Sequence, residues 1–360
     1  MTGPQTTHRD WNSADAAAYQ RFVCAARVFW SNDLFAALRR QVQRHEDDPG
    51  SQAFEARVEA HPTHRMFAWL ERHLQRMRYS GPFGLVEGVN RDRDTLLAAL
   101  SQPLPEGMLR LDPDLSPPGY YGEYDIHQHP GGLRGDPLAG LVYRDAVGSG
   151  VVGKPALHQR FAQLVTRRRA PARILDLGCG FGRSAWAFAA AAPSARVVGI
   201  DLSASCLTVA AHETPAALRE RVTFAQADAV ASGLPAASFD LVTSTMLLHE
   251  MPESVVRELI AETGRLVADG GIVAHLDFLP PRDPLLRILF EGHARRNNEP
   301  FLLQHSRIDV ADAHARAGFS TLETLDFAEE DDALDPGLPR WRLPWNVIVA
   351  TKNVDGGTRR

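Results

Sequence analysis

The sequence predicts an α/β protein in which a Rossmann-like sheet of seven strands follows an α-helical N-terminal region. Two observations predict this class. From about residue 155 onward, short apolar runs alternate with helical segments, a pattern typical of a mostly parallel sheet covered by helices on both faces. One of the runs leads directly into three glycines at alternating positions and then into a helix. A length of 360 residues predicts about two domains, which we place at 1–150 and 151–360.

Helical periodicity dominates the first hundred residues. Apolar side chains recur at helical spacing over residues 14–42, and a second helical stretch covers 54–79 with an interruption at Pro62, which cannot continue a helix smoothly. Residues 95–100 form a third, short stretch. Residues 101–140 are rich in proline and glycine, a composition typical of an ordered connecting arm.

Seven apolar runs are the expected strands of the sheet. They are 173–177, 196–200, 222–225, 239–243, 271–276, 320–326 and 346–351. Helices are expected between most of these strands, at 183–192, 203–214, 253–267 and 308–317. In open α/β sheets, ligands bind at the edge formed by the carboxyl ends of the parallel strands. We therefore expect the functional residues at that edge.

Composition excludes several classes of protein. Apolar residues make up 44% of the chain and charged residues 23%, as in ordinary globular proteins, and a net charge of −5 argues against a protein that binds nucleic acid. The longest apolar run, 185–192, is far too short to span a membrane. Three scattered cysteines and the absence of a signal-like start indicate a cytoplasmic protein without a disulfide framework.

The most specific motif is the glycine turn at Gly178, Gly180 and Gly182. Glycines permit a tight turn and let a ligand lie directly on the backbone. A dinucleotide fold uses G-x-G-x-x-G, whereas here the third glycine comes one position early. Asp176 adds a carboxylate beside the turn, which would repel a diphosphate and suits an amino or sulfonium group. The turn therefore favours S-adenosylmethionine over NAD.

Two further acids fall where an adenosyl ligand needs them. Asp201 ends the second strand, the position from which an acid reaches ribose hydroxyls, and Asp228 follows the third strand, where it can accept from an adenine amino group. Each acid alone is weak evidence, because an aspartate that closes a strand is usually a turn residue or a helix cap. Three acids in register behind three alternating glycines favour the ligand site.

Residues 155–352 resemble the class I S-adenosylmethionine-dependent methyltransferases, and in particular the small-molecule O-methyltransferases. The matching segments are ILDLGCGFG, VVGID, QADA, FDLVTSTMLLHEMP and ADGGIVAHLDF, in the family order. The resemblance implies a last strand reversed beside the sixth. It also implies that Asp176 and the glycines surround the methionine part of the cofactor, that Asp201 binds the ribose and that Asp228 faces the adenine. The full set implied for the cofactor is Asp176, Gly178, Cys179, Gly180, Gly182, Asp201, Leu202, Asp228, Ala229 and Thr245.

His249 is the candidate catalytic base. It lies just past the fourth strand, at the ligand edge of the sheet, and an imidazole with a pKa near ~6.5 is suited to removing a hydroxyl proton. Glu250 is placed to orient or charge-stabilise it. The segment resembles the strand–LHD–helix stretch of small-molecule O-methyltransferases, in which the aligned histidine is the base. A purely structural or substrate-contacting histidine remains the alternative.

Two other clusters are candidates for acceptor binding. The first lies in the arm and comprises Tyr120, Tyr121, Tyr124, His127 and His129. These side chains line a substrate pocket, anchor the arm to the core, or form a metal site with Asp125; our prediction includes no metal. The second is the polar run around Arg295 and Asn298, which is either a solvated helix face or an arginine site for an acidic substrate group.

Together these features predict an S-adenosylmethionine-dependent methyltransferase acting on an oxygen or nitrogen of a small-molecule acceptor, of the secondary-metabolite kind. The expected partners are that acceptor and a second copy of the chain, since the layout resembles dimeric O-methyltransferases; neither nucleic acid nor a membrane is expected. The alternatives are a non-methylating enzyme on the same cofactor, of the cyclase or decarboxylase type, and a cofactor-binding module without catalysis.

Overall fold

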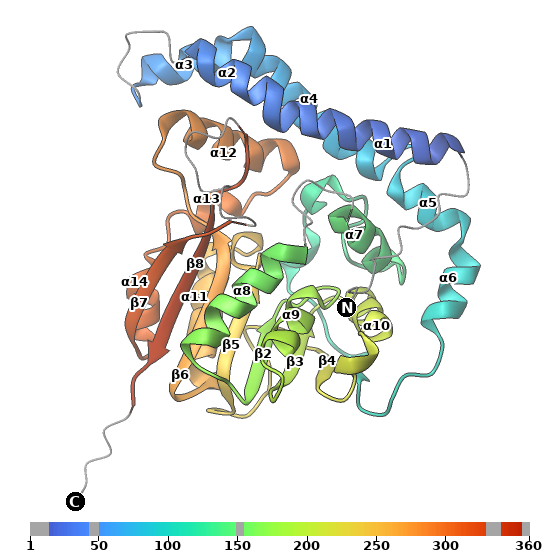
Figure 1. Ribbon diagram of the computed structural model, residues 1–360, viewed down its shortest axis with the longest axis vertical. Coiled ribbons are helices and arrows are strands. Elements are labelled where there is room, and N and C mark those ends of the chain that lie inside the picture. Colours follow the sequence, from blue (N-terminus) through green and yellow to red (C-terminus); the bar gives the residue numbers. More distant parts are fainter. Residues whose placement is uncertain (1–13, 43–49, 149–154, 329–339, 355–360) are drawn as a thin grey trace, which may run out of the picture.

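The structure, a computed structural model, describes residues 14–42, 50–148, 155–328 and 340–354. Figure 1 shows an α/β sheet domain with a layer of N-terminal helices lying across its upper end. The described residues form one sheet with the strand order β1-β4-β3-β2-β5-β6-β8-β7. None of the helices that the structure describes is both long enough and apolar enough to cross a membrane.

The seven predicted strands are confirmed, and an eighth precedes them. The strands are β1 (Leu109–Arg110), β2 (Arg173–Leu177), β3 (Arg196–Asp201), β4 (Val222–Gln226), β5 (Phe239–Thr245), β6 (Val267–Phe278), β7 (Phe319–Asp326) and β8 (Trp345–Lys352). Strand β8 runs antiparallel to β6 and β7, as the resemblance implies. The additional strand β1 comes from the proline-rich arm and pairs parallel to β4; two residues are too few to produce an alternation signal.

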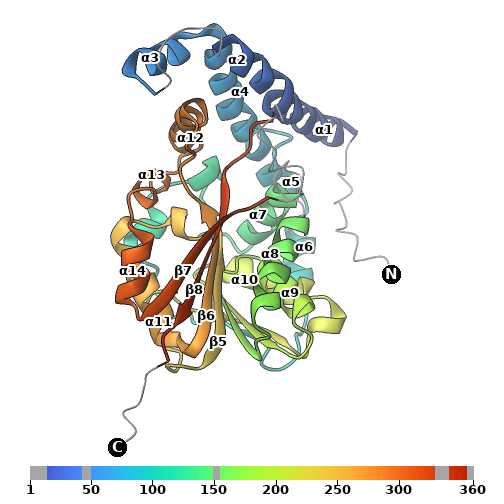
Figure 2. The ribbon, with the colours of Figure 1, turned by 60° about the vertical axis from the view of Figure 1, so that its left-hand side comes forward.

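Helices cover both faces of the sheet. They are α8 (Pro155–Arg168), α9 (Arg183–Ala191), α10 (Ala204–Glu213), α11 (Glu253–Leu266), α12 (Pro284–Asn297), α13 (Leu302–His305) and α14 (Val310–Arg316). Strand β2 shows the two faces: Ile174 packs in a cluster with α8 to α10, whereas Leu175 packs in a second cluster with α11 and α14. Figure 2 shows these two helix groups on opposite sides of the sheet. Burial on both faces explains why the strands are nearly continuous apolar runs.

The N-terminal layer consists of α1 (Ala14–Phe29), a π-helical turn η1 (Trp30–Leu34), α2 (Phe35–Val42), α3 (Gln52–Ala60), α4 (Pro62–Tyr79), α5 (Leu85–Arg91) and α6 (Arg93–Leu100). The helix break predicted at Pro62 is confirmed: His61 is extended, and its side chain caps α4 by accepting from Thr63 N. Helix α12 packs against α4, which connects the N-terminal layer to the sheet domain (Figure 1).

The arm between α6 and α7 (Ala139–Gly148) is ordered, as predicted. Besides β1 it contains the short 3-10 turns η2 (Gly119–Gly122) and η3 (Ile126–Gln128). Because the arm contributes β1 to the sheet, the first 150 residues are not purely a helical cover. The domain boundary predicted at residue 150 lies outside the described residues.

Candidate active site

The glycine turn connects β2 to α9 with a backbone that only glycine adopts easily. Gly178, Gly180 and Gly182 have φ values of 62°, 52° and 91°. A Cβ on Gly178 would lie 2.6 Å from a methyl carbon of Leu247, so a larger residue does not fit there. A Cβ on Gly180 would meet only the ring of Tyr143, at 3.6 Å. The backbone at Gly180 is therefore open to a ligand.

Asp176, which is buried, and Asp201, which is half-buried, place two carboxylates beside this turn. Ser184 donates a hydrogen bond to Asp176, whose Oδ1 atom is buried without a hydrogen-bond partner in the structure. Burial, aided by the negative charge of Asp201, raises the pKa of Asp176 to about 7. Asp201 accepts from the backbone N–H groups of Gly180 and Ser203, each at 2.8 Å, and burial raises its pKa as well. Negative groups kept this dry are stabilised by a positively charged ligand.

The other residues implied for the cofactor lie at the same edge of the sheet. Asp228 is half-buried after β4 and accepts from Val230 N at 3.0 Å. Ala229 and Thr245 are buried, and the Thr245 hydroxyl has no hydrogen-bond partner. Leu202, which follows β3, is half-buried, and Cys179 is buried within the turn. Open backbone, unpaired carboxylate and hydroxyl oxygens and local negative charge together fit S-adenosylmethionine.

Tyr120 and Tyr121 of the arm lie near these acids and do not line the cavity described below. Burial, followed by the charge of Asp201, raises the pKa of Tyr121, whose buried hydroxyl has no hydrogen-bond partner. Burial and then Asp228 raise the pKa of Tyr120 in the same way. Of the predicted substrate residues, Tyr120 and Tyr121 thus lie near Asp228 and Asp201 and not in the cavity lining.

His249 lies in η5 (Leu248–Glu250), past the end of β5, and is 3% exposed. Its Nδ1 lies 2.6 Å from Oδ1 of Asp277, near the end of the neighbouring strand β6. Burial alone would lower the pKa of His249, but Asp277 and then Glu250 raise it to about 10. In turn, His249 lowers the pKa of the buried Asp277 to about 2. The pair is a buried histidine–aspartate dyad whose other ring nitrogen, Nε2, lies 3.4 Å from Glu250.

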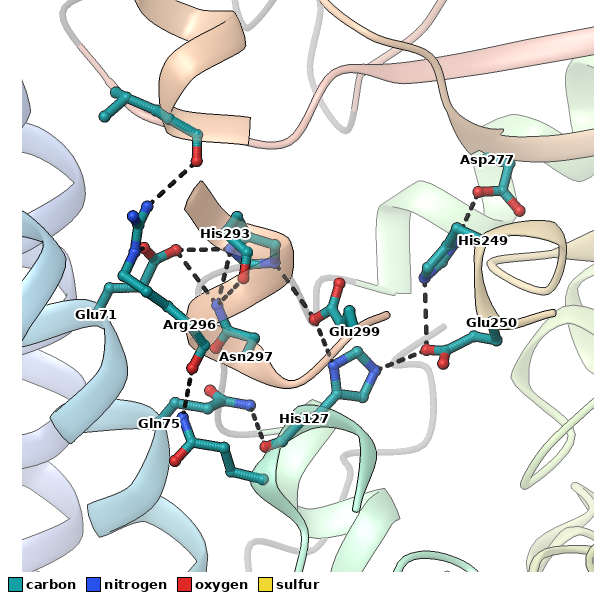
Figure 3. Close-up of polar contacts among 12 residues, drawn as sticks. Glu71, Gln75, His127, His249, Glu250, Asp277, His293, Arg296, Asn297 and Glu299 are labelled. Carbon is teal, nitrogen blue, oxygen red and sulfur yellow. Dashed lines mark hydrogen bonds and ion pairs between the residues drawn. The ribbon is translucent and has the colours of Figure 1, made fainter. Parts of the chain in front are cut away.

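Imidazoles and carboxylates continue from this dyad in an alternating chain, shown in Figure 3. We call it the imidazole–carboxylate chain; its members in order are Asp277, His249, Glu250, His127, Glu299, His293 and Glu71. His127 bridges two carboxylates, at 3.0 Å from Glu250 and 2.8 Å from Glu299. The imidazole–carboxylate chain thus connects the end of β6, through the arm and α12, to helix α4.

His127 has an unusual backbone. His127 and Gln128 have φ values of 57° and 56°, the left-handed region that side chains other than glycine rarely adopt. The surrounding structure holds this conformation: Gln75 donates to the His127 carbonyl at 3.0 Å, and Gln128 donates to the Arg296 carbonyl at 2.8 Å. Strained backbone concentrates at functional sites, and here it presents the imidazole between two acids.

The remaining predicted substrate residues hold the arm in place. His129 stacks on Tyr79 with 4.9 Å between ring centroids, and Tyr124 packs edge-on against Phe301. Asn298 donates to the Asp125 carbonyl at 2.9 Å. Arg295 is exposed and faces Glu59 at 3.8 Å, so the structure does not bring it to the cavity.

His127 contacts Glu250 and Glu299, His129 stacks on Tyr79, and Asp125 is exposed. No group of three or more histidine, cysteine or acidic side chains among the described residues is arranged to hold a metal ion.

A cavity of about 150 Å³ lies where the N-terminal layer meets the dyad. His249, Glu250 and His127 form its floor, and aromatic and aliphatic side chains form most of its walls. Those walls include Trp30, Leu74, Tyr79, Tyr143, Phe278, Leu343 and Trp345. Tyr143 also contacts the glycine turn, so the cavity adjoins the expected cofactor site. This arrangement suits a small acceptor placed between the turn and His249.

Several residues of the site were not singled out from the sequence. Asp277 ends an apolar strand, the same signal that marked Asp176 and Asp201, so it was accessible to the same reasoning. Glu71 and His293 carried no such signal, because each gains its role from a partner more than 200 residues away along the chain. Arg27 and Arg78, which also line the cavity, lie in helices whose polar positions look solvated in the sequence alone.

Comparison with known proteins finds methyltransferases. A family model described as a methyltransferase domain matches residues 174–271. The demethylmenaquinone methyltransferase of Thermus thermophilus is 33% identical over 128 residues, which cover 36% of this chain and 57% of that protein. The trans-aconitate 2-methyltransferase of Streptomyces avermitilis is 41% identical over 143 residues, which cover 38% and 52%. The chain thus spans about half the length of these curated relatives.

Solved structures resemble the chain more loosely. The phosphoethanolamine N-methyltransferase 2 of Haemonchus contortus is 18% identical, with a TM-score of 0.45 over 60% of this chain and 57% of that one. A Nostoc punctiforme protein described as a candidate O-methyltransferase is 16% identical, with a TM-score of 0.48 over 94% and 96% of the two chains.

Proposed function

We propose, from the premise that this chain belongs to the class I S-adenosylmethionine-dependent methyltransferases, that it methylates a hydroxyl oxygen of a small-molecule acceptor, with His249 as general base. One observation carries the choice of oxygen and base: the histidine of the buried His249–Asp277 dyad lines a cavity that adjoins the glycine turn. An amine acceptor is the second possibility within the same proposal. Several matched relatives are named for small-molecule acceptors, among them demethylmenaquinone and trans-aconitate, which supports this acceptor class; one other is named for malonyl-[acyl-carrier protein].

The cofactor residues have separate tasks. The open backbone at Gly180 and the carboxylate of Asp176 would hold the methionine part, Asp201 the ribose, and Asp228 with Ala229 the adenine. S-adenosylmethionine, when bound, supplies a methyl group on a positively charged sulfur. Tyr120 and Tyr121 cover the acids from the arm side and would exclude water from the cofactor.

The dyad holds and moves the acceptor proton. Asp277 accepts the Nδ1–H of His249, which fixes the tautomer and leaves Nε2 to take a proton from the acceptor hydroxyl. Nε2 lies 3.4 Å from Glu250, a contact long enough for an acceptor hydroxyl to replace. In the empty site the pKa of about 10 keeps His249 protonated at neutral pH. Positive charge brought to the glycine turn lowers that pKa, so cofactor binding favours the base form.

The test is methyl transfer to a panel of small phenols, hydroxy acids and amines, with S-adenosylhomocysteine measured as product. We expect acceptor-dependent formation of S-adenosylhomocysteine. His249→Gln should lower kcat by about 10²–10⁴-fold while leaving the affinity for S-adenosylhomocysteine unchanged. Unchanged turnover in His249→Gln would remove the base assignment. Consumption of S-adenosylmethionine without S-adenosylhomocysteine would instead favour the cyclase or decarboxylase alternative.

We also propose a homodimer formed through the outer surfaces of α1 and α4. Phe22, Phe29 and Trp69 are about half exposed on these helices, and large exposed apolar side chains are typical of interaction surfaces. Light scattering should give twice the mass of one chain, and Trp69→Ser combined with Phe22→Ser should shift it toward the monomer. A cytoplasmic location stays a prediction from the cysteine content.

A further inference from the structure

Two arginines lie in the cavity wall contributed by the N-terminal layer. Arg27 comes from α1 and Arg78 from α4. Arg27 donates to the neutral Gln75 side chain at 2.7 Å. The Nε atom of Arg27 is buried without a hydrogen-bond partner, and Arg27 forms no ion pair with a carboxylate of the described residues. Arg78 is 7% exposed and donates to the Ala146 carbonyl. Burial and then the nearby charge of Arg78 lower the pKa of Arg27 to about 10. Two positive charges therefore stand close together in a dry wall.

The carboxylates of the cavity do not neutralise Arg27, because other cations occupy them. His293 lies 2.6 Å from Oε1 of Glu71, and Arg296 binds its Oε2 atom. Glu299 and Glu250 belong to the imidazole–carboxylate chain, where both contact His127 (Figure 3). Each acid is thus paired within the imidazole–carboxylate chain, and none of them forms an ion pair with Arg27.

The size and lining of the cavity restrict what can supply the missing anion. A cavity of about 150 Å³ accommodates a single benzene-sized ring. The rings of Trp30, Tyr143 and Phe278 among its walls favour a flat, apolar body. A guanidinium presents parallel N–H donors that match the two oxygens of a carboxylate. His249 lines the same cavity, and its proposed role as a base suits a hydroxyl.

We infer that the acceptor is a one-ring hydroxyaromatic acid whose carboxylate binds at Arg27 while its hydroxyl meets His249. This inference rests on the proposed function and specifies its substrate class. It explains why the Arg27 guanidinium is buried in the cavity wall beside a neutral side chain. The arginines set which acceptor binds and in which direction, and they take no part in the proton transfer.

The experiment compares matched acids and amides by calorimetry on the full chain saturated with S-adenosylhomocysteine. The ligands are 3- and 4-hydroxybenzoate and the corresponding hydroxybenzamides, which have the same shape without the charge. The proteins are wild type, Arg27→Gln, Arg27→Lys and the control Arg21→Gln, an exposed arginine on the same helix. Each variant is first checked for its thermal midpoint and its affinity for S-adenosylhomocysteine.

We expect wild type and Arg21→Gln to bind one of the acids at least tenfold more tightly than its amide. Arg27→Gln should lose this preference because its affinity for the acid falls while its affinity for the amide stays the same. Arg27→Lys should keep part of the preference. Equal affinity of wild type for acid and amide, or no binding of either acid, would overturn the inference without using any variant. A preference that persists in Arg27→Gln would also overturn it. Failure of wild type to bind S-adenosylhomocysteine would instead refute the proposed function.

Discussion

Replacing Asp277 by asparagine removes the charge that keeps the proton on His249 and leaves the shape of the dyad nearly unchanged. The two side chains contact each other at 2.6 Å, and Asp277 is the largest influence that raises the pKa of His249 from 6.5 to about 10. A base acts only when it is deprotonated. At pH 7 a pKa of about 10 leaves about one His249 in a thousand neutral, whereas a pKa near ~6.5 leaves most of them neutral.

The substitution should therefore move the pH dependence of activity toward acid. In wild type, kcat/KM for the acceptor should rise about tenfold per pH unit until it reaches the pKa of His249. In Asp277→Asn the plateau should begin about two to three pH units lower, because the remaining effect of burial disfavours the imidazolium. In wild type, the Leu248 N–H donates to the second oxygen of Asp277 at 2.8 Å. In the variant, the asparagine carbonyl can still accept from His249, but the asparagine NH₂ group then faces the Leu248 N–H. The unmet donor should cost about 1–3 kcal/mol of stability.

The assay is kcat/KM against pH from 6 to 10.5 at saturating S-adenosylmethionine, with thermal midpoints measured alongside. Asp269→Asn is the matched control, since Asp269 is an exposed acid on the same strand and should leave the profile unchanged. The cofactor's charge acts on both proteins, so the difference between their profiles is the quantity tested. Coincident profiles in wild type and Asp277→Asn would refute the account of His249 as a base controlled by its partner.

Three further predictions concern the cofactor and stability. Asp201→Ala should weaken S-adenosylhomocysteine binding by about 1–3 kcal/mol in a calorimetric titration, because ribose hydroxyls lose their acceptor; an unchanged affinity would contradict the ribose assignment. Tyr121→Phe should change the same affinity with no effect on folding, if its unpaired hydroxyl faces the cofactor; identical affinities would place it outside the site. Glu299 and Glu71 raise the pKa of His293 to about 9. The ion pairs of protonated His293 therefore stabilise the fold fully below pH ~6.5, and this contribution is lost as pH rises through about 9. The thermal midpoint of wild type should fall over that window, and that of His293→Gln should fall less; parallel curves would contradict this.

The parts of the fold that rest on local sequence were predictable. Strands buried on both faces produce continuous apolar runs, so all seven were found within a few residues. The glycine turn was found because its positive φ values demand glycine at fixed positions. The short strand β1 and helices α5, α7 and α13 were not predicted, since two residues in a proline-rich segment, or one to three turns of helix, carry little periodic signal. No range was predicted for α8 or α12 either, although each has 14 residues.

The acceptor side of the site depends on which distant segments meet, and sequence patterns do not encode this. His127 and Glu299 are in contact although 172 residues separate them. The adjacent Arg295 and Arg296 show the same limit of pattern reasoning, since a helix turns about 100° per residue. This rotation along α12 directs Arg296 inward to Glu71 on α4, whereas Arg295 is exposed to solvent. Only the position of α4 distinguishes the two arginines.

A competitive titration tests most directly whether the glycine turn holds a sulfonium compound. Calorimetry of the full chain with S-adenosylmethionine, S-adenosylhomocysteine and NAD should show one site per chain for the first two ligands and no heat of binding for NAD. Tight binding of NAD, with both sulfur compounds ignored, would contradict the account.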